Sequence, residues 1–278
     1  MTTALGRPIR IVYFAGPYLE PSAVRFVTML DEHPDIDLVL GLCQGDGQGL
    51  RHRLRNLWRR RGWVAVPVLG LELITALVEF LRHPRASLDL RRRSRHALSV
   101  FVTVPDVHAP GVLERVRAAA PDLGVIYGAP ILKPELFMIP SFGTLGIHHG
   151  RAPEYRGKKT TFWEMYHGER SAGITIQRVN PGIDTGEVVR RGEVEIGRKG
   201  YGRVWREVED LGRRIYLEAI LDVRRGTARF EAQETAGPRR PLYRQPGPGD
   251  ILRFWSRRRA GQSKPAAAER APPQAPCK

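Results

Sequence analysis

Two ionisable side chains near the ends of expected strands could move protons: His148 and Asp184. His148 ends the apolar stretch 143–148, and Asp184 lies in a Gly-flanked turn after the next apolar stretch. Sheets of the α/β class bind ligands at the carboxyl ends of their strands, so both side chains could return to one edge of such a sheet. A carboxylate beside an imidazole raises the proton affinity of the ring and fixes its tautomer, as general acid–base or oxyanion chemistry requires. Taken alone, a His and an Asp 36 residues apart are weak evidence, so at this point they are candidates for a catalytic pair.

Other motifs that could carry chemistry fit poorly. The glycine-rich stretch 45–49 lacks the spacing of a dinucleotide fingerprint, and 157–160 lacks the upstream Gly and the Ser or Thr of a phosphate loop. His148 and His149 are adjacent, and neighbouring residues of a strand point to opposite faces, so joint binding of one metal ion is not expected. The two cysteines have no metal-type spacing and predict no disulfide framework. We expect no metal site.

The elements that must position the pair alternate along the chain. Short apolar runs that are typical of buried strands occur at 10–15, 36–43, 100–104, 123–127, 143–148, 173–179 and 188–196. Segments with helical spacing of apolar residues lie between them at 24–30, 111–120, 161–166 and 202–223, the last ending at Gly226. This alternation predicts an α/β fold of the Rossmann-like, doubly wound kind with a mostly parallel central sheet.

The basic charge is concentrated in two segments. The chain of 278 residues has a net charge of +16. Residues 51–96 contribute +9, from twelve Arg and three acids, and 253–278 contribute +6, which leaves +1 for the rest. A nearly neutral body argues against a nucleic-acid-binding protein. We expect one catalytic domain over 8–259, with 51–96 as a basic helical insertion and 260–278 as a disordered tail.

Two interpretations of the insertion stay open. The apolar segment 63–81 holds Glu72, Glu79, Pro67 and Gly70, which makes it a poor membrane span. It would either pack on the sheet with solvated arginines around it, or dock on an anionic membrane face or an acidic partner. The N-terminus lacks the apolar core of a signal peptide. We therefore expect a cytoplasmic protein, with peripheral attachment to the inner membrane face as the second interpretation.

A larger motif surrounds the expected pair and resembles the folate-dependent formyltransferases, the family of methionyl-tRNA, glycinamide ribonucleotide and nucleotide-sugar N-formyltransferases. The matching residues are Gly143, His148, Pro153, Tyr155, Arg156, Gly157, Gly173, Thr175, Asp184, Thr185 and Gly186. Weaker similarity covers most of 8–235 apart from 51–96. The resemblance implies transfer of a formyl group from 10-formyltetrahydrofolate, the co-substrate, to a primary amine.

The resemblance also implies roles for individual residues. His148 would stabilise the tetrahedral intermediate, and Asp184 would hold it charged and relay the amine proton through water. The expected folate contacts, made largely by backbone groups, are Tyr127, Gly128, Ile131, Leu132, Asn180 and Asp184. The expected contacts of the amine acceptor are Gly16, Gly146, His149, Arg156 and Gly157.

One departure from the family pattern concerns Gly146, which stands where the family has its catalytic Asn. Loss of such an oxyanion donor elsewhere lowers rates by ~10²–10³. Either His149 or the backbone of 146–150 replaces the amide, or the protein is slow, alters the reaction, or binds without catalysing. The acceptor that we expect is a nucleotide-linked or lipid-linked amino sugar or another small amine. A methionyl-tRNA enzyme is the less favoured alternative, because only about 50 residues follow Gly226, whereas the family's tRNA-binding barrel has about 100.

Overall fold

A seven-stranded sheet forms the centre of the described residues. The computed structural model describes residues 5–16, 21–45, 84–233 and 242–259. The strands are β1 (Ile9–Ala15), β2 (Ile36–Gln44), β3 (Phe101–Val104), β4 (Leu123–Tyr127), β5 (Thr144–His148), β6 (Ser171–Arg178) and β7 (Val188–Glu195). Their order is β3-β2-β1-β4-β5-β6-β7, with parallel pairing from β3 to β5 and antiparallel pairing of β5 with β6 and of β6 with β7. The mostly parallel α/β sheet predicted from the sequence is thereby confirmed.

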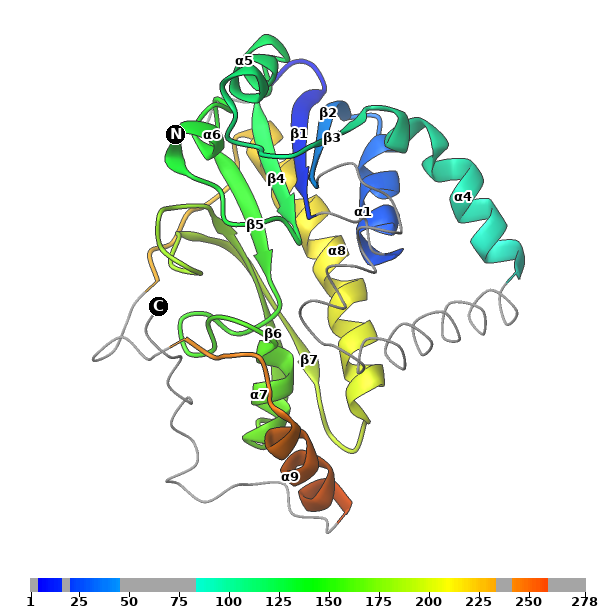
Figure 1. Cartoon of the computed structure of the whole chain (residues 1–278), viewed down its shortest axis with the longest axis vertical. Helices are drawn as coiled ribbons and strands as arrows, with labels where there is room; N and C mark the ends of the chain where they lie inside the picture. Colours follow the sequence, from blue (N-terminus) through cyan, green and yellow to red (C-terminus); the bar gives the residue numbers. More distant parts are fainter. Residues whose placement is uncertain (1–4, 17–20, 46–83, 234–241, 260–278) are drawn as a thin grey trace.

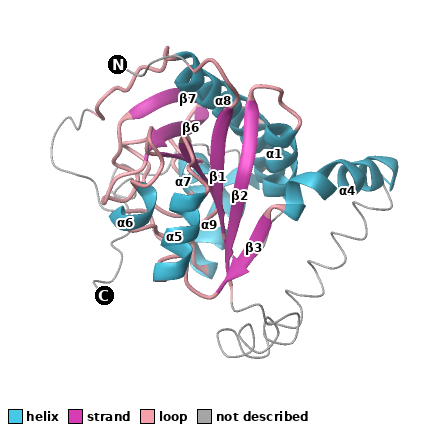
Figure 2. Ribbon diagram, turned by 90° about the horizontal axis from the view of Figure 1, so that it is seen from above, coloured by secondary structure: helices cyan, strands magenta, loops and turns pink. Residues whose placement is uncertain are grey.

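Helices cover both faces of this sheet (Figures 1 and 2). They are α1 (Pro21–Asp31), α4 (Pro84–Ser99), α5 (Pro110–Ala118), α6 (Pro134–Phe137), α7 (Thr160–Tyr166), α8 (Tyr201–Arg225) and α9 (Pro248–Arg259). α1 and α8 pack on one face and α5 and α6 on the other. No helix of the described ranges is long and apolar enough to cross a bilayer.

The strand pattern explains why two cores form. Along β1, Ile11 and Tyr13 are buried on the α1 and α8 face, while Val12 and Phe14 are buried on the α5 and α6 face. Such alternation is the period of two expected for a strand covered on both faces. The long helix α8 ends as predicted at Gly226, whose φ of 72° suits a residue without a Cβ.

The basic insertion is described only in its last part. Within α4, Ala97 is fully buried, Arg93 forms an ion pair with Glu32 at 2.5 Å, and His96 lies 2.8 Å from Asp31 at the end of α1. This end of the insertion therefore packs on the protein's own helix. Residues 51–83, which carry the apolar segment, and the expected tail 260–278 lie outside the described residues.

Candidate active site

The side chain of His148 sits at the carboxyl end of β5, where it is 6% exposed. Its Nδ1 lies 3.3 Å from Asp184 Oδ2, and its Nε2 lies 2.6 Å from the carbonyl oxygen of Tyr155. A carbonyl oxygen can only accept a hydrogen bond, so the Nε2 atom carries the proton of its contact with Tyr155, while Nδ1 lies within ion-pair distance of the Asp184 carboxylate. Because the Tyr155 carbonyl occupies Nε2, Nδ1 is the atom that faces Asp184 and a reacting group.

Asp184 accepts hydrogen bonds from two donors besides its contact with His148. Its Oδ2 accepts a hydrogen bond from the backbone N–H of Gly157 at 3.0 Å, and its Oδ1 accepts one from Gln177 Nε2 at 3.1 Å. Gln233 Nε2 donates in turn to Gln177 Oε1 at 2.7 Å. Gly157 has a φ of 106°, and a Cβ there would lie 2.5 Å from the carbonyl oxygen of Tyr243, so this donor position requires glycine.

One cavity of about 160 Å³ lies beside Asp184, between the ends of β4, β5 and β6. Of the predicted folate residues, it is lined by Ile131, Leu132, Asn180 and Asp184, and the predicted acceptor residue Gly146 also lines it. The Asn180 side chain accepts hydrogen bonds from Gly182 N and Thr185 Oγ1, which fixes the shape of the turn. Apolar walls and a turn rich in peptide groups suit a flat heteroaromatic ring such as a pterin.

Two predicted folate residues do not line this cavity. The hydroxyl of Tyr127 turns to the other face of the sheet and donates to Glu209 Oε2 at 2.6 Å. The carbonyl oxygen of Gly128 faces Gly16, where a Cβ would come within 2.6 Å of it. Gly16 and Gly128 therefore bring two loops into close contact, and neither borders a cavity beside the pair.

A second cavity, of about 280 Å³, lies on the other side of His148. Its lining residues are Ile147, His148, His149, Gly157, Lys158, Lys159, Thr160, Trp205 and Gln245. Lys159 is exposed and its Nζ lies 5.5 Å from the centroid of the Trp205 ring. Arg156 is buried and does not line this cavity, whereas its neighbour Gly157 does. The His148–Asp184 pair thus stands between two cavities.

His149 borders the same cavity as His148 but has different partners. Its Nε2 lies 3.4 Å from Glu209 Oε1, and its ring packs against Tyr127 and Trp205. Burial lowers the pKa of His149 to about 3, so the ring is neutral at pH 7. His148 and His149 contact different carboxylates, as expected for neighbouring residues of a strand. His149 still lines the same cavity as His148, because the strand ends at His148.

Sequence reasoning missed three contributors to the site: Gln177, Lys159 and Trp205. The signal for Gln177 was a polar residue inside an apolar strand, because such a side chain needs a buried partner. Neighbouring lysines such as Lys158 and Lys159 are usually a solvated charge run, and only the structure places Trp205 of α8 beside them. Among the described side chains, no group of three or more His, Cys, Asp or Glu forms a metal site.

Part of this chain is similar in sequence to known proteins. Residues 95–220 match the family model described as formyl transferase. A methionyl-tRNA formyltransferase from Desulfotalea psychrophila is 33% identical over 127 residues, which are 45% of this chain and 39% of that protein. The chain therefore spans about two fifths of the length of this curated relative.

Solved structures of formyltransferases share the fold of the described residues. Glycinamide ribonucleotide transformylase 1 from Symbiobacterium toebii aligns with a TM-score of 0.55 at 19% identity, over 83% of this chain and 96% of that one. A sugar N-formyltransferase from a Shewanella species aligns with a TM-score of 0.54 at 12% identity, over 88% and 86%. The likeness at such identities establishes the fold alone. Residues 95–220 are thus similar in sequence to the formyl transferase family, and the described residues share the fold of solved formyltransferases.

Proposed function

We propose that this protein transfers a formyl group from 10-formyltetrahydrofolate to a primary amine. The observation that carries the proposal is the position of the His148–Asp184 pair between two cavities. Asp184 lines the first cavity, His148 lines the second, and Ile147 lines both. A group transfer between two substrates needs such an arrangement, because the reacting atoms must meet at the acid–base pair.

The proposed chemistry assigns a task to each side chain. The acceptor nitrogen bonds to the formyl carbon, negative charge develops on the formyl oxygen, and the bond from that carbon to the departing nitrogen breaks. His148 stabilises the oxygen through Nδ1, and the carboxylate of Asp184 beside it favours the charged form of the ring. Asp184 takes the proton that the acceptor nitrogen loses, and a water molecule carries it to the departing nitrogen.

Folate would lie in the cavity beside Asp184, held by the Asn180–Asp184 turn and by Ile131 and Leu132. It supplies the activated formyl carbon when bound. Gly146 lines this cavity and offers no side chain to the developing oxyanion. The neutral ring of His149 is one replacement donor, and the peptide groups of 146–150 are the other.

For the acceptor we favour a nucleotide-linked amino sugar. Lys158 and Lys159 supply positive charge for a diphosphate, and Trp205 supplies an aromatic face on which a ring can stack. Solved sugar N-formyltransferases have this fold. The competing acceptor is methionyl-tRNA, since methionyl-tRNA formyltransferases are the curated relatives that match in sequence.

The test is turnover with 10-formyltetrahydrofolate and three kinds of acceptor: nucleotide-linked amino sugars, small free amines and methionyl-tRNA. Formation of tetrahydrofolate and the mass gain of the acceptor are measured together. The His148→Ala and Asp184→Asn variants should lose turnover. The matched control is His96→Ala, because His96 forms a surface pair with Asp31 at 2.8 Å that touches neither cavity. Full activity of the His148→Ala protein, or no transfer to any acceptor, would contradict the proposal.

A further inference from the structure

An apolar groove leads away from the acceptor cavity toward the last described helix, α9. The groove measures about 260 Å³ and is lined by Lys159, Phe162, Tyr201, Gln245, Pro246, Ile251, Phe254 and Trp255. Lys159 and Gln245 also line the cavity beside His148, so the two spaces adjoin. An acceptor bound at His148 therefore has an apolar exit along α9.

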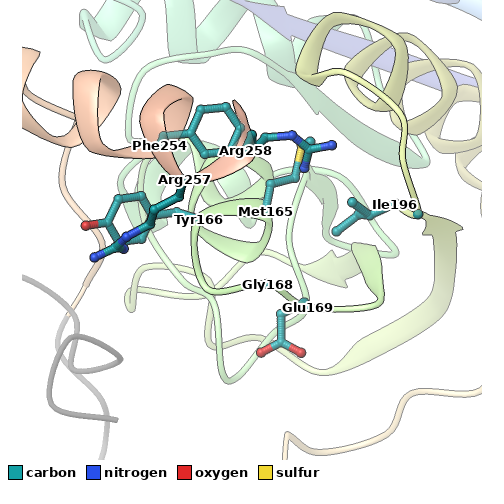
Figure 3. A pocket seen from close by; sticks show the side chains of 9 residues that line it. Met165, Tyr166, Gly168, Glu169, Ile196, Phe254, Arg257 and Arg258 are labelled. Atoms are coloured by element: carbon teal, nitrogen blue, oxygen red, sulfur yellow. The ribbon is translucent and has the colours of Figure 1, made fainter. Parts of the chain in front are cut away.

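Contacts on its inner side fix α9 to the body of the protein. Phe254 is 2% exposed, and the guanidinium of Arg257 lies 5.0 Å from the centre of the Tyr166 ring. Arg258 donates to the carbonyl oxygen of Lys199 at 2.6 Å. Figure 3 shows Phe254, Arg257 and Arg258 around a small pocket of about 60 Å³ against α7, on the side of α9 that faces the body. These contacts determine which side of α9 faces the body of the protein and which side faces outward.

The outer side of α9 combines exposed apolar side chains with arginines. Leu252 is 71% exposed, Trp255 is 46% exposed and Ile251 is 42% exposed. Residues 252, 255 and 259 follow helical spacing, which places Arg259 on the same face as Leu252 and Trp255. Arg253 flanks this face and is 58% exposed. The single acid of the helix, Asp250, is buried and paired with both Arg244 and Arg253.

We propose that this outer face of α9, formed by Ile251, Leu252, Arg253, Trp255 and Arg259, docks on an anionic phospholipid bilayer. Apolar and aromatic side chains enter the interface of such a surface while arginines meet the headgroups. The groove then opens at the lipid surface. This inference rests on the proposed function in one respect: the adjoining cavity beside His148 is taken to be the acceptor site.

Charge favours a bilayer over a second copy of the chain. In a symmetric pair the same patch meets itself, so Arg253 and Arg259 would approach their own counterparts. Asp250 is buried and already paired with Arg244 and Arg253, so it presents no exposed carboxylate to Arg259. An anionic bilayer supplies the opposite charge over the whole face.

The experiment is co-sedimentation of the full chain with vesicles of phosphatidylcholine alone or mixed with phosphatidylglycerol, at low and high salt. Binding is expected to the anionic vesicles and to weaken with salt. The double variant Leu252→Gln/Arg259→Gln should bind at least about tenfold more weakly, since one Arg near an anionic surface accounts for about fivefold. Neither residue lines the groove, so transfer to a soluble acceptor and the circular dichroism spectrum should stay unchanged.

Leu88→Gln is the matched control, because Leu88 is 55% exposed on the basic helix α4. The proposal is overturned if Leu88→Gln weakens binding and the α9 variant does not, if neutral vesicles bind equally well, or if the α9 variant instead abolishes a dimer in sedimentation analysis. Vesicle binding without transfer to any amine would refute the proposed function and leave the docking surface standing.

Discussion

Substitution of Gly146 by Asn tests whether a side-chain amide in the proposed folate cavity speeds formyl transfer. Gly146 lies within β5 and is not among the glycines with positive φ, so a side chain is compatible with its backbone. A Cβ at this position would lie 3.5 Å from Val179 Cγ2 and 4.0 Å from Ile126 Cβ, which are ordinary contacts. Gly146 also lines the proposed folate cavity, so the amide would face the reacting formyl group.

The expected effect on rate is large and that on stability small. A single oxyanion donor is worth about 10²–10³ in kcat, or about 2.7–4 kcal/mol. Replacing a strand glycine changes the free energy of unfolding by about 1 kcal/mol or less when the new side chain fits. We therefore expect Gly146→Asn to fold normally and to raise kcat by up to about 10³ if no other donor acts.

Single-turnover formyl transfer measures the chemical step without product release. The matched control is Gly146→Ala, which adds the same Cβ without a donor and should leave the rate near that of the parent protein. If Gly146→Asn folds and reacts no faster than Gly146→Ala, the developing charge is already stabilised by His149 or by peptide groups. If both variants are slower, the open space beside Gly146 is itself needed by the substrate.

Three further predictions follow from contacts around the site. Gln177→Leu removes one donor to Asp184 and should lower kcat about 10–100-fold, as expected for a hydrogen bond to a charged group, while Gln233→Ala should have a smaller effect in the same assay. Burial raises the pKa of Glu164 to about 8, so its neutral form adds stability that is fully present below the unfolded value of 4.5 and is lost as pH rises through 8. Denaturant unfolding across this range should show that the free energy of unfolding falls by up to about 5 kcal/mol, at 1.36 kcal/mol per pH unit. The Glu164→Gln variant should not show this fall. If its pH profile is unchanged, the Glu164 carboxyl is not the source of the effect. Lys159→Gln should raise KM for an anionic acceptor several-fold and leave KM for folate unchanged, and equal changes in both constants would place Lys159 outside the acceptor cavity.

The sheet could be predicted closely because its strands are buried on both faces. The apolar runs at 36–43 and 123–127 correspond to β2 and β4 within a residue, since such runs have no other stable place in a chain of this composition. The end of α8 was equally predictable, because Gly226 gives the helix a left-handed cap. Local signals of this kind determine elements and their order.

Features that depend on distant contacts were not predictable. α9 was not predicted as a helix: its last residues, 253–259, were noted for their charge, and its anchoring needs Tyr166 of α7 and the carbonyl of Lys199. Gln177 and Gln233 meet only after β6 and the segment following α8 come together. The second cavity depends on Trp205 approaching His149, with ring centroids 5.1 Å apart, from a helix more than 50 residues later.

His148 and Asp184 come together through a loop rather than through neighbouring strand ends. The expectation was that strand ends meet at one edge, but β6 runs antiparallel to β5 and its end at Arg178 pairs with Leu145 rather than with His148. Three residues of strand separate Arg178 from Thr175, the partner of His148, which is about 10 Å at 3.4 Å per residue. The following loop must turn back over that distance. The two ends of this loop are joined by a hydrogen bond from Arg178 N to the carbonyl oxygen of Glu187, at 2.8 Å. Gly186 lies so close to Arg178 there that a Cβ on Gly186 would overlap the carbonyl oxygen of Arg178. The Asp-Thr-Gly sequence is therefore a geometric requirement as much as a chemical one, because the glycine permits the close return that carries the carboxylate to the imidazole.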